Sequence, residues 1–526
     1  MLFLQIAFLL LLASIQLALG SPNQNRDEKD GAQLSQQYCV SNIENDPQIL
    51  LEQSLDAKDW ALSNGLVKLM NSCNECYYKK GKVNIVTQFL PFALYPSPFP
   101  RSLFQQAVDV HQAMLLLYFR ISSDYAFLKD AHRQVVNSER KSIIQSLIKR
   151  LDNLYNDGFQ QPVAMFCQRA DYMASEDDNG QIVLKQVEVN TGAIGGIATS
   201  ARFSQLHRRM VANAGLDASE AVTPLNQSDK MYAETLYHSW QQFGNNEAVI
   251  LFVHGNPNSH LMLESRQIVH KLEEITSKKV KSRFITLKEA FSRLKIDPID
   301  KSLIFDDKYV VAVLVDRIGR EISDAELAVC VEFERSTAIK SRPMSFFVSH
   351  TKRMQQVLST PGIVERFFTG PGEEGMAKAI RKVQIKGWPI GADENIEEGI
   401  RQKAMENPQD YVLKANDCGP TGMSFNEDMV KKLQSMAPAE RDFYYLTEKL
   451  RPTTVKNHFV RPNAETMLNV NANPELGIFG CLVGNMNTGQ VSFFSRIGHM
   501  MKSKMDNVDE GGVWRGNSVY DSPYLV

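Results

Sequence analysis

The chain has 526 residues, of which 43% are apolar and 22% charged, so it is a folded protein of two or three lobes and not a disordered one. Its 58 Lys and Arg against 60 Asp and Glu give a net charge of −2, which excludes a nucleic-acid binder that relies on bulk positive charge. No internal stretch reaches the roughly 18 apolar residues that a membrane-spanning helix needs.

Residues 1–20 are predicted to be a secretory signal peptide. Ile6 to Ala13 is an unbroken apolar run, and the small residues Ala18 and Gly20 place the cleavage site after Gly20. The alternative is an N-terminal membrane anchor, which the short apolar run and the lack of a stop-transfer pattern disfavour. We therefore expect a secreted protein that has no membrane attachment after cleavage.

The remaining chain alternates between helical and extended patterns, which predicts an α/β architecture. Apolar residues at helical spacing predict helices over residues 102–120, 141–156 and 426–436. The predicted strands cover residues 183–189, 249–253, 309–315 and 410–416. Turn signals at 361–362, 370–372 and 387–389 mark predicted lobe edges.

The seven cysteines are too few for a disulfide scaffold in a chain of this length. An odd number leaves at least one free thiol or an intermolecular pair. Cys73 and Cys76 form a C-x-x-C motif, which fits either a redox site or a local structural disulfide. The sequence around them does not resemble thioredoxin, and this favours the structural disulfide.

Several segments are suited to phosphate and metal binding, although each has an ordinary alternative. Glu188 and Asn190 end a predicted strand on one face, where their oxygens could bind a hard cation, but a solvated strand end is the commoner explanation. Lys414 ends another strand before a glycine-containing turn that could hold a polyphosphate, or be an ordinary turn. Single charges such as Glu448 and Lys504 are more often solvated when taken alone.

Taken together and in order, these segments resemble the eukaryotic glutathione synthetase family over about residues 91–526. The most specific segments are QRADYM (168–173), LKQVEVNT (184–191), TK (351–352), VLK (412–414), VRP (460–462), ELGIFG (475–480), GGV (511–513) and PYLV (523–526). The predicted signal peptide points to the secreted glutathione-synthetase-like branch of plant-parasitic nematodes.

The resemblance implies an ATP-grasp fold with a mobile lid and a smaller substrate-binding α/β domain. It also implies a homodimer that uses ATP and Mg²⁺. The implied parts are 21–235 and 351–526 for the ATP-grasp core, 236–350 for the substrate-binding domain, about 388–470 for the lid and about 506–518 for a closing loop. In that family, ATP phosphorylates the cysteinyl carboxylate of γ-glutamylcysteine, and the amine of glycine then attacks the acyl phosphate.

The family's site residues carry over to positions in this sequence. The implied ATP-binding residues are Glu188, Lys352, Lys414, Gly419, Thr421, Gly422, Glu448, Lys449, Glu475, Lys504 and Glu510. The implied substrate-binding residues are Arg169, Arg317, Arg320, Lys502, Val513 and Trp514, with Lys502 and Arg317 also expected to take part in catalysis. The metal ligands that the resemblance implies are Glu188 and Asn190, and Asp417 is our own candidate for the third.

The sequence also departs from the family pattern. Cys418 stands where the family has a metal-binding glutamate, and a soft thiolate is a poor ligand for Mg²⁺, so Asp417 is expected to replace it. Pro420 removes one N–H from the phosphate-binding loop. Lys502 replaces an arginine, and Trp514 replaces a small residue of the closing loop.

Two hypotheses follow. The first is an ATP-dependent ligase that joins γ-glutamylcysteine, or a related thiol dipeptide, to glycine or another amino acid. The second is a secreted, catalytically altered or inactive homologue that binds a nucleotide, a thiol peptide or a host partner. A thiol oxidoreductase based on Cys73 and Cys76 has the least support.

Overall fold

The computed structural model describes residues 46–70, 86–137, 142–157, 161–191, 194–255, 260–318, 322–390, 394–415, 422–462, 464, 468–509, 511–513 and 516–526. The predicted signal peptide and the Cys73/Cys76 motif lie outside these ranges. Within them, none of the helices combines the length and the apolar character that crossing a bilayer requires.

A mixed sheet of fifteen strands dominates the described part of the chain. Its main path runs β18 (Val455–Val460), β3 (Phe92–Ala93), β22 (Ser518–Asp521), β21 (Gly498–Met505), β19 (Leu468–Asn485), β5 (Val163–Glu176), β12 (Ile339–Lys340), β11 (Tyr309–Arg317), β10 (Leu303–Phe305) and β9 (Leu294–Ile296). Branching from it are β6 (Ile182–Thr191) and β17 (Arg451–Pro452) on β5, β20 (Val491–Phe494) on β19, β7 (Val249–His254) on β11 and β8 (Ser282–Thr286) on β7.

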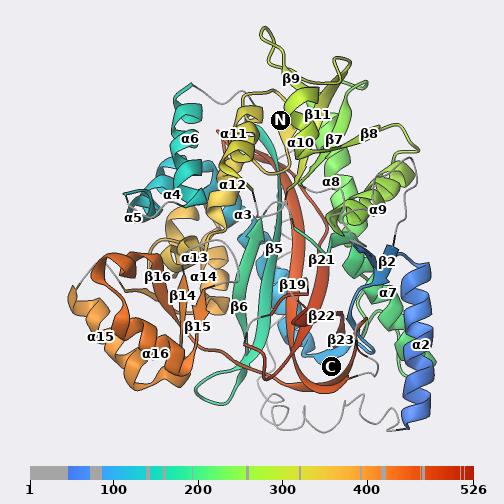
Figure 1. Ribbon diagram of the computed structural model, residues 1–526, viewed down its shortest axis with the longest axis vertical. Helices are drawn as coiled ribbons and strands as arrows, with labels where there is room; N and C mark the ends of the chain where they lie inside the picture. Colours follow the sequence, from blue (N-terminus) through green and yellow to red (C-terminus); the bar gives the residue numbers. More distant parts are fainter. Residues whose placement is uncertain are drawn as a thin grey trace. The chain divides into compact units, whose positions relative to one another are not determined.

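The antiparallel strands β6, β5, β19 and β21 lie side by side in the middle of this sheet (Figure 1). Asp171 on β5 is opposite Glu188 on β6 and opposite Gly477 on β19, while Glu475 is opposite Lys502 on β21. Because residues directly opposite one another project to the same side of a sheet, this register gathers charged side chains on one face.

Helices cover both faces of these central strands. On one face α3 (Arg101–Ser123) packs closely, because β19 has glycines at the contact: a Cβ at Gly480 would lie 2.6 Å from Leu115, and one at Gly484 2.7 Å from Phe119. On the other face α7 (Ile197–Asn213) and α8 (Ser228–Phe243) pack against β21. The charged face of the sheet is therefore the α7 side, since Met500 contacts the positions of both Gly196 and Gly477.

The remaining helices surround this core. They are α2 (Pro47–Ser63), α4 (Tyr125–Ala131), α5 (Arg133–Asn137), α6 (Ile143–Asp157), α9 (His260–Ile275), α10 (Leu287–Arg293), α11 (Asp324–Phe333), α12 (Met344–Ser349), α13 (Lys352–Ser359) and α14 (Glu374–Val383). Local sequence sets several of their starts: Ser323 and Glu326 form a capping box at α11, and Thr351 accepts a hydrogen bond from the Met354 N–H at α13. Two small sheets stand apart, β1 (Val67–Met70) with β2 (Val86–Phe89), and β4 (Ser97–Phe99) with β23 (Pro523–Leu525).

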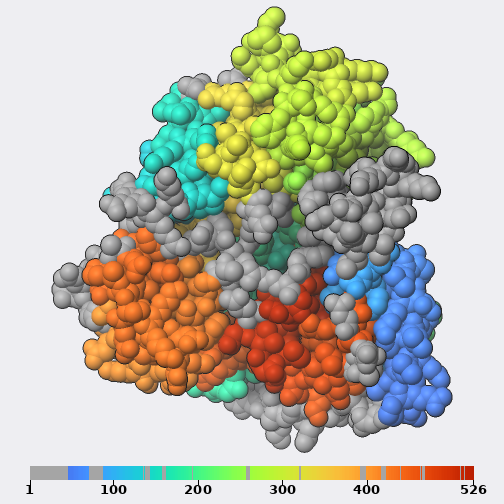
Figure 2. All heavy atoms as spheres, in the orientation of Figure 1, coloured from blue at the N-terminus to red at the C-terminus, as the bar shows by residue number. Residues whose placement is uncertain are grey.

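The described residues between 387 and 448 form a separate layer with its own core, which we call the lid. Its sheet runs β13 (Gly387–Pro389), β16 (Tyr444–Glu448), β14 (Tyr411–Ala415) and β15 (Met423–Ser424). The helices α15 (Glu394–Glu406) and α16 (Asn426–Ser435) belong to the same segment, and Leu413, Met429, Leu433 and Leu446 are buried together in its core. In Figure 2 the lid (orange) and the C-terminal strands (red) both reach the surface on the face shown.

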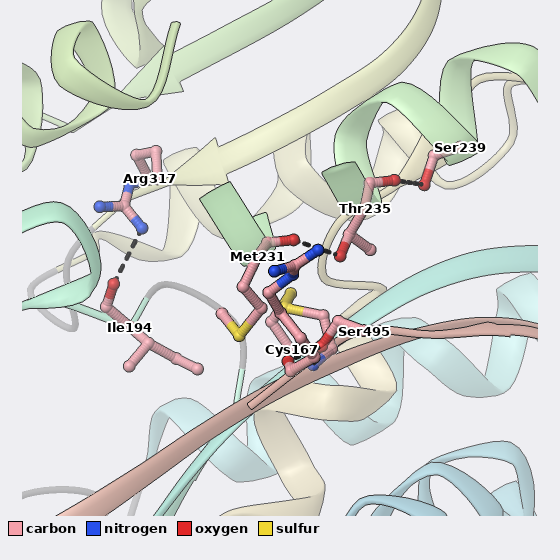
Figure 3. The surroundings of a disulfide bond; sticks show 9 residues. Cys167, Ile194, Met231, Thr235, Ser239, Arg317 and Ser495 are labelled. Carbon is pink, nitrogen blue, oxygen red and sulfur yellow. Dashed lines mark hydrogen bonds between the residues drawn. A yellow bond between two sulfur atoms is a disulfide. The ribbon is translucent and has the colours of Figure 1, made fainter. Parts of the chain in front are cut away.

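A disulfide joins the two longest central strands. Cys167 on β5 and Cys481 on β19 are directly opposite one another, 314 residues apart in sequence, and both are buried (Figure 3). Cys330 on α11 is a buried free cysteine. The sequence did not indicate this pairing, because strand register between distant segments cannot be counted from cysteine spacing.

The described structure confirms the predicted α/β class and each predicted helix and strand, within a few residues at the ends. The prediction of a turn at 387–389 was wrong in one respect, because Gly387–Pro389 is the strand β13. Trp388 packs near Tyr411 across the lid sheet, and an X-Pro pair favours extended backbone, so packing overrode the turn signal.

Candidate functional site

A cavity of about 310 Å³ lies between the lid and the charged face of the central strands. Its wall brings together most of the described residues for which the resemblance implies ATP binding. These are Glu188, Lys352, Lys414, Glu448, Lys449, Glu475 and Lys504, and Lys502 joins them. We call this space the lid cavity.

Five lysines of the described chain face the lid cavity, which suits it to a polyanion. Lys414 comes from β14 of the lid and Lys352 from the first turn of α13. Burial, followed by the nearby charge of Lys352, lowers the pKa of Lys414 to about 8. Two mutually repelling lysines in a buried place are expected where phosphate oxygens bind, since these would relieve the repulsion.

The central strands bring carboxylates to the cavity lining, beside Lys502 and Lys504 of β21. Glu188 projects from β6 and Glu475 from β19. Burial raises the pKa of Glu475, and the charges of Asp171 and Glu188 add to this, although Lys502 at 2.8 Å opposes it. Carboxylates crowded together in a buried wall fit a hard divalent cation such as Mg²⁺, which prefers oxygen ligands.

Asn190 supplements this metal-binding prediction. It lies on the same face as Glu188, and its amide nitrogen donates to Asp171 at 3.2 Å, which orients the amide group. Across the described ranges, no group of three or more His, Cys, Asp or Glu side chains is arranged as a metal site. The third candidate ligand, Asp417, lies outside those ranges.

Apolar side chains also line the cavity. They are Val187 of β6, Val412 and Met423 of the lid, and Leu450 just after the lid. Glu448 accepts the backbone N–H of Lys386 at 3.1 Å, so it ties β16 to the entry of the lid. An apolar slot edged by strand backbone can receive a planar base next to the lysines.

Asp171 is the side chain that sequence reasoning missed. It is 1% exposed and accepts from Nε and Nη2 of Arg169 at 2.6 and 2.8 Å. Lys502 also approaches it, at 3.3 Å. The available signal was its position two residues after Arg169, since residues i and i+2 of a strand share a face.

The two arginines predicted to hold the dipeptide have protein partners. Besides Asp171, Arg169 donates to the carbonyl of Gly195 at 3.2 Å. Arg317 is buried and donates to Glu264 on α9 at 2.6 Å and to the carbonyl of Ile194 at 2.9 Å; Figure 3 shows the contact with Ile194. Neither arginine lines the lid cavity. Both guanidinium groups thus hold the turn between β6 and α7.

Some of the remaining predicted residues are described by the structure and others are not. The carbonyl of Gly422 accepts the N–H of Ala415 at the end of β14. Val513 packs against the core that includes α7 and does not line the cavity. Lys504 donates to the carbonyl of Asp509, which lies in the first part of the predicted closing loop. Arg320, Asp417, Gly419, Thr421, Glu510 and Trp514 lie outside the described residues.

Comparison with known proteins agrees with this arrangement. The family model described as "Eukaryotic glutathione synthase, ATP binding domain" matches residues 48–525. Glutathione synthetase from Xenopus laevis is 30% identical over 92% of this chain and 99% of its own, and that from Homo sapiens is 27% identical over 91% and 98%.

A solved structure extends the comparison. A glutathione synthetase-like effector from Globodera pallida, in its apo form, is 60% identical, with a TM-score of 0.77 over 93% of this chain and all of its own. The likeness to a nematode effector and the ATP-grasp fold are thus as the sequence predicted. The chain belongs to the eukaryotic glutathione synthase family.

Proposed function

We propose that the chain is an ATP-dependent ligase that joins γ-glutamylcysteine, or a related thiol dipeptide, to glycine or another amino acid. The observation that carries the proposal is the lid cavity, whose lining combines five lysines of the described chain with the carboxylates of Glu188 and Glu475. Lysines and carboxylates in one cavity suit a nucleotide whose phosphates bind the lysines while a metal ion binds the acids.

The chain's own groups account for the chemistry as follows. Lys352 and Lys414 would hold the phosphates, and Arg169 with Lys502 would hold the dipeptide, with its carboxylate directed at the γ-phosphate. The carboxylate takes the phosphoryl group and ADP leaves; the acceptor amine then attacks the acyl carbon and phosphate leaves. Closure of the lid would exclude water, which otherwise hydrolyses the acyl phosphate. Magnesium, held by Glu188, Asn190 and Asp417, would neutralise phosphate charge.

We further propose that the protein is secreted. The Cys167–Cys481 disulfide supports this, because such bonds persist in oxidising compartments. The similarity to a nematode effector supports it as well. The homodimer and the host partner stay predictions.

A second candidate is a binding protein without turnover. Arg169 is paired with Asp171, and Arg317 is paired with Glu264. Both arginines that would hold the dipeptide therefore already have carboxylate partners, and this favours the second candidate. In this case the chain would bind a nucleotide or a thiol peptide but form no product.

One experiment separates the two candidates. The purified mature protein is incubated with ATP, Mg²⁺, γ-glutamylcysteine and a panel of amino acids, and products are identified by mass spectrometry. The ligase predicts a tripeptide with stoichiometric ADP, which the Lys352→Met variant fails to make. Saturable ATP binding without product from any acceptor would support the binding protein and contradict the ligase.

A further inference from the structure

Asp171 is the centre of a group that we call the charged cluster: Arg169, Asp171, Glu475 and Lys502. Arg169 donates to both carboxylate oxygens of Asp171, and Lys502 bridges Asp171 at 3.3 Å and Glu475 at 2.8 Å. Asn190 donates to the same Asp171 oxygen as Lys502 does. One buried carboxylate thus contacts three side chains to which the proposed function gives a role.

The backbone beside Asp171 is adapted to this arrangement. Gly477 on β19 is opposite Asp171, and a Cβ there would lie 2.7 Å from Oδ1 of Asp171 and 2.8 Å from Cδ of Arg169. Real side chains do not approach so closely, so only glycine leaves room for the Arg169–Asp171 pair. Two strands therefore shape the space that the pair occupies.

The charges in the cluster balance. Arg169 and Lys502 contribute two positive charges, and Asp171 and Glu475 two negative charges; Asp171 is buried and the other three side chains are partly buried. A buried charge whose partner is removed is strongly destabilised, so the cations keep their places only while the carboxylates remain.

We propose that Asp171 is a positioning residue that fixes Arg169 and Lys502 for binding of the dipeptide, and this rests on the proposed function. With Nε and Nη2 of Arg169 directed at Asp171 and Nη1 donating to the carbonyl of Gly195, a ligand carboxylate meets only the N–H groups of that arginine that these contacts leave over. Lys502 must then supply the second cationic contact. One carboxylate of the dipeptide is therefore bound by Arg169 and Lys502 together. It does not form the two parallel hydrogen bonds that a free guanidinium group would give it.

The test uses Asp171→Asn, which keeps the shape of the side chain and removes its charge. Glu373→Gln is the matched control, because Glu373 forms a two-point pair with Arg120 away from the lid cavity. Calorimetric titrations of the full mature protein with γ-glutamylcysteine and with Mg²⁺-ATP are compared. Asp171→Asn should weaken dipeptide binding about tenfold or more and change ATP binding by less than about twofold. The control should change neither.

Three results would overturn the proposal. Unchanged dipeptide binding shows that Asp171 positions nothing, and tighter binding shows that it only competes with the ligand. An equal loss of dipeptide and ATP binding indicates general damage to the site.

The proposed function and this inference can fail separately. If the wild-type protein binds neither ligand, the proposed function fails. A double-mutant cycle of Asp171→Asn with Arg169→Gln, measured by urea unfolding, then still decides whether Asp171 holds Arg169. Additive effects overturn the inference, and a clear coupling between the two substitutions supports it.

Discussion

Lys414 on the lid and Lys352 at the start of α13 face the same cavity, and their positive charges repel one another. This repulsion, added to burial, is what brings the pKa of Lys414 down to about 8. A bound polyphosphate would offset both effects and so raise the pKa of Lys414. Nucleotide affinity should therefore depend on pH.

Nucleotide affinity should fall as the pH rises through about 8. Below that pH Lys414 is already charged in the free protein; above it, binding must take up a proton to restore the charge. Calorimetry with Mg²⁺-ATP between about pH 7 and about pH 9.5, in buffers of different ionisation enthalpy, measures this uptake. Lys414→Arg keeps the charge at every pH and should abolish the dependence. A wild-type affinity that does not change over this range would contradict the assignment.

Gly477→Ala should damage the charged cluster, because the added methyl group would overlap Asp171 and Arg169. Overpacking of this kind costs about 1–3 kcal/mol of unfolding free energy. Urea unfolding and dipeptide titration measure the two effects. Gly375→Ala on α14 is the control, since its added methyl group meets no neighbour within 4 Å and alanine favours a helix. Equal stability of the two variants would rule out the crowding argument.

Removing the Cys167–Cys481 disulfide should destabilise the protein. The bond closes a span of 314 residues, and loss of a native disulfide costs about 2–5 kcal/mol. Unfolding of Cys167→Ala/Cys481→Ala is compared with that of Cys330→Ala, which removes the buried free thiol. Peptide mapping after alkylation without reductant checks the bond itself. Free thiols at both positions in the secreted protein would show that the bond does not form.

Arg317 and Glu264 should behave as a coupled structural pair. Both side chains are buried, at 0% and 3% exposure, and Glu264 also accepts the Ala198 N–H at the start of α7. Breaking such a pair by Arg317→Gln costs about 3–5 kcal/mol, because Glu264 keeps an uncompensated buried charge. Adding Glu264→Gln should recover part of this loss in urea unfolding. Full additivity would mean that the two side chains act independently.

The sequence predicted those parts of the site that depend on local order along one strand. Glu188 and Asn190 share a face because strand residues alternate, and Lys414 lies at the end of a strand that its apolar neighbours indicate. Their grouping with Lys352 and Glu475 came from the family resemblance, because no spacing rule relates strands and helices hundreds of residues apart.

The features that the sequence did not predict depend on the register between distant strands and on which helix packs beside which strand. The pairing of Cys167 with Cys481 and the contact of Gly477 with Asp171 follow from the alignment of β5 with β19, which single-sequence patterns do not reveal. Glu264 reaches Arg317 because α9 packs beside the carboxyl end of β11, and α9 itself carries no recognisable motif.

Hydroxylamine trapping would detect the proposed acyl phosphate itself, and it does not require the natural acceptor to be known. Hydroxylamine attacks an acyl phosphate at the carbonyl carbon, releases phosphate and leaves a stable hydroxamate. We expect γ-glutamylcysteine hydroxamate and an equal amount of ADP, formed only when ATP, Mg²⁺ and the dipeptide are all present, and lost in Lys352→Met. If the folded protein binds ATP and the dipeptide but yields no hydroxamate, it does not phosphorylate this substrate, and the ligase account is contradicted.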